Sequence, residues 1–143
     1  MAMNLRIRLS IALLLPWCGP ALLGAAAPSV APPQTLRVDY VHFGNAGEER
    51  FALERVVVEG LPWPGSLEQT IDDTNLGKYR FEVIDRESRR VLYSRGFASI
   101  YGEWETTAEA KSMNRTFSES LRFPGIDRPG RIVVKKRDAR NVF

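Results

Sequence analysis

The sequence has little of the two residue types on which metal and nucleophile sites most depend: it contains one cysteine, Cys18, and one histidine, His42, among 143 residues. A catalytic zinc ion needs three protein ligands, usually including histidine, and a single imidazole without close partners does not make such a site. The sequence also lacks a GxSxG nucleophile motif. We therefore assign no catalytic residue, no metal ligand and no cofactor, and we interpret His42 as an ordinary edge-strand residue.

Long apolar runs are also missing. A membrane-spanning helix needs about twenty continuous apolar residues, whereas the apolar run Leu9–Leu15 is interrupted by Pro16. Two arginines precede this run, and small residues follow at 24–27, which is the layout of a secretory signal peptide. We predict cleavage after Ala26, so that residues 1–26 are a signal peptide and the mature protein is periplasmic or extracellular.

Cys18 lies inside the predicted leader, where Pro16 and Trp17 occupy the places that a lipidation site gives to small residues. We therefore expect no lipid anchor and no membrane attachment after cleavage. The mature chain has no cysteine, so its core must hold the fold without disulfides. Domains above roughly 70–80 residues seldom need such staples.

An excess of one charge is missing too. The chain has 20 basic and 17 acidic residues, and removal of the leader's two arginines leaves 18 against 17. Because nucleic-acid binding usually requires a clearly basic face, this balance excludes nucleic acid as an expected partner. The basic run Lys135–Arg137 with Arg140 is interpreted as a solvated strand end.

Alternating apolar and polar residues indicate β-strands. Prolines make 27–34 a spacer, the predicted domain spans 35–137, and 138–143 begin a linker or C-terminal tail. Within the domain the strand signals lie at 36–40, 51–59, a hairpin over 78–97, 116–123 and 131–137. Six strands separated by turns predict an all-β protein, an antiparallel two-layer β-sandwich.

Three phenylalanine and leucine positions are predicted to face the core: Phe81, Phe117 and Leu121. Glu119 interrupts the apolar face of its strand, so it lies near a strand end or pairs with a cation. Val56–Val58 form a β-branched centre that is typical of a strand buried on both faces or nearly so.

One loop, 98–115, is too long to be a simple connection. Thr106 and Glu109 form a capping-box pattern, which predicts one short helix from about Thr107 to Met113. Glu103 and Glu105 flank Trp104 in the same loop. Glycosidases use two carboxylates across a sugar, but residues two apart on an extended segment face the same way and imply no cleft.

Several segments carry a family resemblance: SRGF at 94–97, GEWETTAEA at 102–110, RTFSESLRFP at 115–124 and KKRDA at 135–139, with TLRVDY and LPWPG upstream. Together they resemble the N-terminal domain of the IgA-peptidase-like zinc metallopeptidases. The resemblance implies a non-catalytic β-sandwich, with the zinc and the HExxH motif in a separate C-terminal domain that nothing in this sequence matches.

By this resemblance, the chain is a non-catalytic accessory domain whose partner is a peptidase catalytic domain or its protein substrate. The candidate docking residues are Trp63, Tyr101, Glu103, Trp104 and Glu105. Trp63 lies between two prolines, which suits either a docking anchor or a plug at one end of the core. The alternative function is a secreted carbohydrate-binding module that uses Trp63, Tyr101 and Trp104 as stacking platforms.

Overall fold

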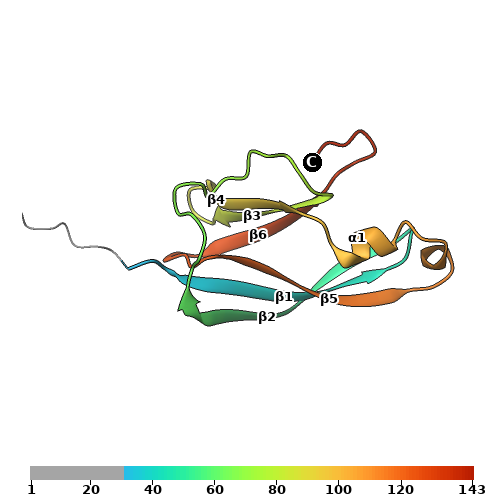
Figure 1. Cartoon of the computed structure of the whole chain (residues 1–143), viewed down its shortest axis with the longest axis horizontal. Helices are drawn as coiled ribbons and strands as arrows, with labels where there is room; N and C mark the ends of the chain where they lie inside the picture. The colour runs from blue at the N-terminus through green and yellow to red at the C-terminus, as the bar shows by residue number, and fades with distance from the viewer. Residues whose placement is uncertain (1–30) are drawn as a thin grey trace, which may run out of the picture. The chain divides into compact units, whose positions relative to one another are not determined.

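The computed structural model describes residues 31–143. The predicted signal peptide 1–26 and the first part of the spacer 27–34 lie outside the described residues. The elements, shown in Figure 1, are β1 (Gln34–Gly44), β2 (Glu49–Pro62), β3 (Tyr79–Asp85), β4 (Val91–Phe97), α1 (Ile100–Trp104), the 3-10 helix η1 (Glu109–Lys111), β5 (Arg115–Pro124) and β6 (Gly130–Lys136).

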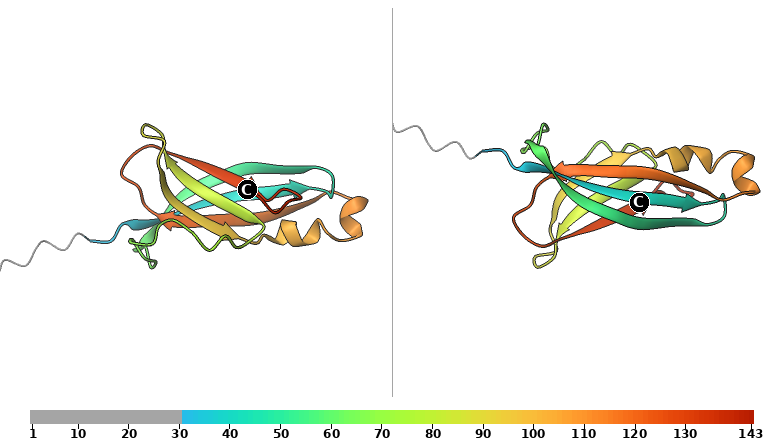
Figure 2. Two further views of the ribbon diagram at one scale, coloured as in Figure 1. Left: turned by 90° about the horizontal axis from the view of Figure 1, so that it is seen from above. Right: turned by 90° about the horizontal axis from the view of Figure 1, so that it is seen from below.

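These strands form two antiparallel sheets, one in the order β2-β1-β5 and the other in the order β4-β3-β6. Figure 2 shows the two sheets from above and below, with the crossing strands of one layer behind those of the other. This confirms the predicted all-β, antiparallel two-layer sandwich with a short α-helix. The β3–β4 hairpin is also confirmed.

The apolar core lies between the sheets, around the central strands β1 and β3. Inward residues on these strands alternate with outward ones, because successive side chains of a strand point to opposite faces. Phe81 and Leu121 are buried, as predicted. Phe117 is only half-buried and packs in a second, smaller cluster. The main core contains Val38, Tyr40, Phe81, Val83, Tyr93, Leu121 and Phe123.

β2 corrects the prediction of a strand buried on both faces. It is an edge strand, and Val56 and Val58 are 58% and 59% exposed. The run Val56–Val58 indicates a preference for extended backbone, but the burial of its side chains depends on what covers the strand. Here the opposite sheet does not extend over the face that these two residues present.

Of the predicted helix at 107–113, the structure has the short 3-10 helix η1 at Glu109–Lys111, and the α-helix of this loop lies outside the predicted range. The α-helix begins earlier, because the Ser99 hydroxyl caps it by accepting a hydrogen bond from the Gly102 backbone N–H at 2.8 Å. Glu109 does not cap a helix at Thr106; its carboxylate accepts the indole N–H of Trp104 at 2.7 Å.

Within residues 31–143, no helix has the length and apolar character needed to cross a membrane.

The last residues fold against the end of β6. The Asp138 carboxylate accepts backbone N–H groups of Arg140 and Val142, each at 2.9 Å. The guanidinium of Arg137 lies 3.9 Å from the centre of the Phe143 ring and donates to the carbonyl oxygens of Gly77 and Asn141. Most of the predicted basic patch is thus engaged within the domain, because Lys135 also pairs with Glu82 at 2.7 Å.

Candidate functional site

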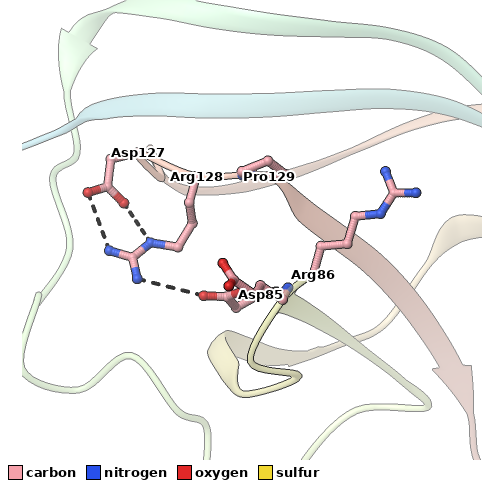
Figure 3. A pocket seen from close by; sticks show the side chains of 6 residues that line it. Asp85, Arg86, Asp127, Arg128 and Pro129 are labelled. Atoms are coloured by element: carbon pink, nitrogen blue, oxygen red, sulfur yellow. Dashed lines mark hydrogen bonds and ion pairs between the residues drawn. The ribbon is translucent and has the colours of Figure 1, made fainter.

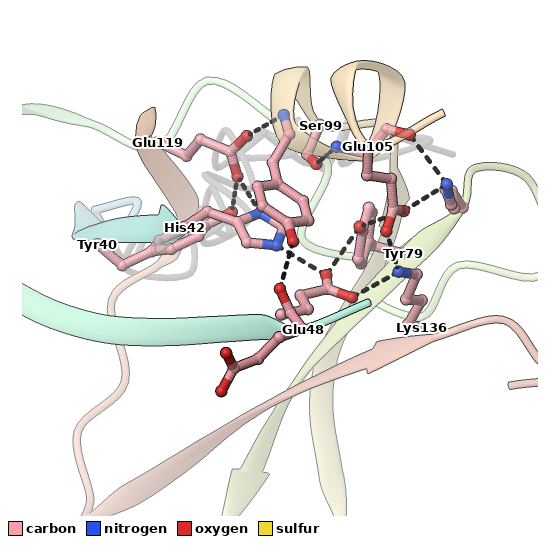
Figure 4. A network of polar contacts seen from close by, with 12 residues as sticks. Tyr40, His42, Glu48, Tyr79, Ser99, Glu105, Glu119 and Lys136 are labelled. Carbon is pink, nitrogen blue, oxygen red and sulfur yellow. Dashed lines mark hydrogen bonds and ion pairs between the residues drawn. The ribbon is translucent and has the colours of Figure 1, made fainter. Parts of the chain in front are cut away.

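A group of ionisable and tyrosine side chains meets between the sheets next to α1 (Figure 4). We call this group the polar network. It draws residues from β1, β2, β3, β5 and β6 and from the segments beside β3 and α1. Its members are Tyr40, His42, Glu49, Lys78, Tyr79, Glu105, Glu119 and Lys136.

His42 is at the centre of the network and is fully buried. The prediction that it is an edge-strand residue is wrong, since β1 is the central strand of its sheet and His42 faces inward with Tyr40. Its ring stacks between Phe51 and Tyr101, with centroid distances of 4.1 and 4.0 Å. Its Nε2 lies 2.7 Å from a Glu49 oxygen, and its Nδ1 lies 3.1 Å from a Glu119 oxygen.

Each ring nitrogen of His42 has one carboxylate neighbour. An ionised carboxylate only accepts hydrogen bonds, and a neutral imidazole donates from one nitrogen alone. Both nitrogens of His42 lie within hydrogen-bond distance of carboxylate oxygens, so a proton on either nitrogen has an acceptor. The ammonium groups of Lys78 and Lys136 pair with carboxylates of the same network, because buried charges require such partners.

Glu119 pairs with a cation, as one of the two predicted alternatives stated. Its carboxylate also accepts the hydroxyl of Tyr40 at 2.8 Å and the backbone N–H of Tyr101 at 3.4 Å. Burial raises the pKa of Glu119, but hydrogen bonds from His42 and Tyr40 outweigh burial and leave the pKa below its usual range. For Tyr40, burial and the neighbouring carboxylate both raise the pKa, so the phenol remains a donor.

Glu105 forms the outer side of the network. Lys136 donates to it at 2.7 Å and Lys78 at 2.5 Å. Burial raises the pKa of Glu105, but the two ammonium groups lower it by more, so the net pKa lies below its usual range. Lys136 also donates to Glu49, and these two carboxylates outweigh burial and raise its pKa. The Tyr79 hydroxyl donates to Glu49 at 2.8 Å.

Other side chains of the domain surround the His42 ring. Aromatic rings cover both faces of His42, and carboxylates occupy both of its nitrogens. A general base must be within hydrogen-bond reach of the proton that it removes. The imidazole is therefore enclosed by protein groups on every side that these contacts cover.

The predicted docking residues separate into buried and exposed ones. Tyr101 is fully buried and Trp104 is 8% exposed; the Tyr101 hydroxyl donates to the carbonyl oxygens of Asn45 and Glu48 at 2.8 and 2.9 Å. Trp104 packs on Phe117 in the second cluster. Neither ring presents a face to solvent, so the carbohydrate-binding alternative loses two of its three platforms.

Glu103 and Glu105 do not face the same way, because they lie on and beside a helix rather than on an extended segment. Glu103 is exposed and Glu105 points into the network.

Trp63 is half-buried, packs against the main core and meets the Tyr93 ring edge-on at 5.7 Å. Its indole N–H has no acceptor within the described part of the chain.

A surface pocket of about 440 Å³ lies beside the β3–β4 turn (Figure 3). Three of its charged residues, Asp85, Asp127 and Arg128, are engaged with one another and with the turn. Arg128 donates to Asp127 at 2.7 Å and lies 3.6 Å from Asp85. Asp85 in turn accepts the backbone N–H groups of Ser88 and Glu87, which lower its pKa. These contacts hold the β3–β4 turn in place.

The family model described as Peptidase M64 N-terminus matches residues 29–143. The chain belongs to this family. No curated protein matches the sequence. The matched region contains the whole described sandwich, so this fold is that of an M64 N-terminal domain of the IgA-peptidase-like metallopeptidases.

The segments that carry the resemblance supply part of the polar network in this M64 N-terminal domain. RTFSESLRFP is β5, which supplies Glu119, and GEWETTAEA continues α1 and supplies Glu105. Among residues 31–143, no three histidine, cysteine, aspartate or glutamate side chains are placed to hold a metal ion.

Sequence reasoning missed the network as a unit. His42 and Glu119 each occupy inward positions of their strands, in line with Tyr40 and Leu121. Two polar residues at inward positions of separate strands were the available signal, because buried charges require partners. The identity of those partners required the register between β1 and β5.

Proposed function

We propose that this chain is the exported, non-catalytic accessory domain of an M64 peptidase, and that it docks on the catalytic domain or positions its protein substrate. The match to the N-terminal part of a peptidase family over 29–143 carries the proposal. In the resemblance on which it builds, catalysis belongs to a separate zinc domain.

The polar network supports a non-catalytic role. Catalytic acids and bases need access to a substrate atom, whereas the imidazole and the three carboxylates here hold one another. Their contacts join β1 and β2 to β5, β3 and β6. These contacts are those of a rigid scaffold, which suits a domain that positions another domain.

Glu103 and Trp63 are the proposed contacts, because they retain exposed surface. The buried side chains of α1 and its C-terminal end hold this helix against the sheets and so fix the position of Glu103. These side chains are Tyr101, Trp104 and Glu105. The Lys78 ammonium reinforces this placement by donating to the Gly102 carbonyl oxygen at 2.9 Å.

A comparison of substrates tests the positioning role. The catalytic domain is assayed alone and with this domain in the same chain, on a folded protein substrate and on a short peptide that carries the same scissile sequence. The domain should raise kcat/KM for the protein and leave the peptide unchanged. Equal effects on both substrates, or none on either, would contradict positioning.

A matched pair of variants tests the surface. Glu103→Arg should reduce the gain on the protein substrate, whereas Glu87→Arg, an exposed glutamate in the β3–β4 turn, should not. Equal losses in both variants would assign the effect to general charge rather than to α1.

The isolated chain should cleave neither casein nor immunoglobulin, and mass spectrometry of the secreted protein should find an N-terminus near Ala27. Cleavage that a chelator abolishes would refute the non-catalytic role. A lipid-modified Cys18 would refute the predicted processing.

A further inference from the structure

β2 has an open edge that is unusually long and apolar. It runs for 14 residues and pairs with β1 on one side only. Figure 2 shows it along the border of its sheet. Soluble proteins normally protect such edges, because unpaired backbone groups accept a further strand. Leu53 is 67% exposed on this strand, and Phe51, Val56, Val58 and Leu61 are exposed with it.

The apolar side chains of β2 line a groove. Its volume is about 380 Å³, and residues of β1, β2, β5 and β6 line it. Leu53 and Val56 of β2 and Ile132 and Val134 of β6 are among them, together with Tyr40 of β1. An edge strand that also exposes an apolar face is typical of an interaction surface.

A bulge sets which residues share this face. Tyr40 pairs with Leu53 and Asp39 with Arg55, so Glu54 is an extra residue in β2. Leu53 and Val56 consequently lie on the same face, although they are three apart. Without the bulge they would point to opposite faces of the sheet.

This shift makes β2 complementary to itself. If a second copy runs antiparallel with Glu54 opposite Arg55, then Leu53 lies opposite Val56 and Phe51 opposite Val58. The same register places Arg50 opposite Glu59. Each pair joins two residues of one face, apolar with apolar and acid with base. Opposite charges across a strand pair are favourable, and like charges are not.

The charges at the centre are available for such pairing. Glu54 is exposed and has no charged partner among residues 31–143, and the Arg55 side chain is 68% exposed despite its contact with Asp39. A two-fold axis between the strands would form two Glu54–Arg55 contacts, as an isologous interface requires.

We propose that two copies of this chain associate through β2, antiparallel and with Glu54 of each opposite Arg55 of the other. The two β2-β1-β5 sheets become one six-stranded sheet, and the exposed apolar faces of both β2 strands lie side by side. This assembly is independent of the docking role proposed above, since it uses neither α1 nor Trp63.

Charge exchange at the central pair tests the proposal. Sedimentation velocity is measured on the purified chain, on Glu54→Arg and on Arg55→Glu separately, and on an equimolar mixture of the two variants. Each single variant places like charges opposite each other twice, so its dimer dissociation constant should rise roughly tenfold or more. In the mixture, the paired arginines of one variant would face the paired glutamates of the other, and dimers should return. Glu87→Arg is the matched control and should dimerise like the unmodified chain.

Recovery in the mixture also shows that both variants are folded. Backbone hydrogen exchange gives a second reading, since β2 amides of the unmodified chain should become protected as its concentration rises. A chain that is monomeric at every concentration, or a dimer that both single variants leave intact, overturns the proposal. So does protection of β2 that appears only when a peptidase domain is added, which would assign the edge to another partner.

Discussion

The sandwich interior has two parts that lie on the same strands and are held together differently. Along β1 the inward residues pass from Val38 to Tyr40 to His42, and along β5 they pass from Leu121 to Glu119. The Val38 end of β1 and the Leu121 end of β5 lie in the apolar core, whereas His42 and Glu119 lie in the polar network. The same alternation of inward and outward residues thus supplies side chains to both the apolar core and the polar network.

The two kinds of interior make different demands on their neighbours. Apolar burial is non-directional and contributes about 25 cal/mol per Å² removed from water, so any well-packed neighbour serves. A buried charge needs a particular partner at hydrogen-bond distance, and removal of one partner leaves the other uncompensated. The core should therefore tolerate changes of shape, and the network should not tolerate changes of charge.

Truncation in the apolar core should have the greatest effect. Phe81→Ala should lower the free energy of unfolding by about 3–5 kcal/mol, because it removes a buried ring and leaves a cavity. Phe81→Leu keeps most of the volume and should cost less than about 1.5 kcal/mol. Denaturant melts measure both. A loss below about 1 kcal/mol for Phe81→Ala would show that the core can collapse around the missing ring.

The second-largest loss of stability is expected in the polar network. Glu119→Ala should cost about 3 kcal/mol, because it leaves the buried His42 ring and the Tyr40 hydroxyl without this hydrogen-bond partner. A double variant, Glu119→Leu with His42→Leu, should cost less than the sum of its single changes, since neither member of the pair is left buried without the other. Additive losses in thermal melts would mean that the two groups do not interact.

The pH dependence of stability separates the two parts further. The pKa values of Glu105 and Glu119 are lowered from 4.5 by their partners. The stability that these groups contribute is therefore fully present above pH 4.5 and is lost as the pH falls through their folded-state pKa values. Lys136 acts in the opposite sense, because its raised pKa gives stability that disappears as the pH rises above 10.5.

Urea melts between pH 7 and pH 3 should consequently show a steeper acid loss in the unmodified chain than in Glu119→Gln. The variant has no carboxylate to titrate at that position. Equal slopes would show that Glu119 is not responsible for acid sensitivity. Phe81→Leu serves as the control and should keep the unmodified slope, because it changes no titratable group.

The open face of β2 should respond least. Val56→Thr should change the free energy of unfolding by less than about 0.5 kcal/mol in dilute solution, since the side chain is mostly exposed. The same substitution in the core, Val83→Thr, should cost more because it buries a hydroxyl. A large loss at Val56 in the monomer would show that the groove is closed in solution.

Much of the fold follows from the sequence. Tyr79, Phe81 and Val83 alternate with charged residues, and the structure places them inward on β3. All six predicted strands are present because alternation and turn residues act within a few positions of the chain. The long loop was predicted less well, since both Ser99 and Thr106 can cap a helix and only packing selected Ser99.

Burial and partnership depended on the tertiary structure. Val56–Val58 are as β-prone as a central strand, yet β2 lies at an edge, and no local pattern encodes which strand is last in a sheet. His42 and Glu119 are 77 residues apart. The residue pattern alone specifies which side of each strand faces inward, because side-chain direction alternates with every residue. That an imidazole, three carboxylates and two ammonium groups meet there is a property of the folded chain, because their meeting depends on the register between strands distant in the sequence.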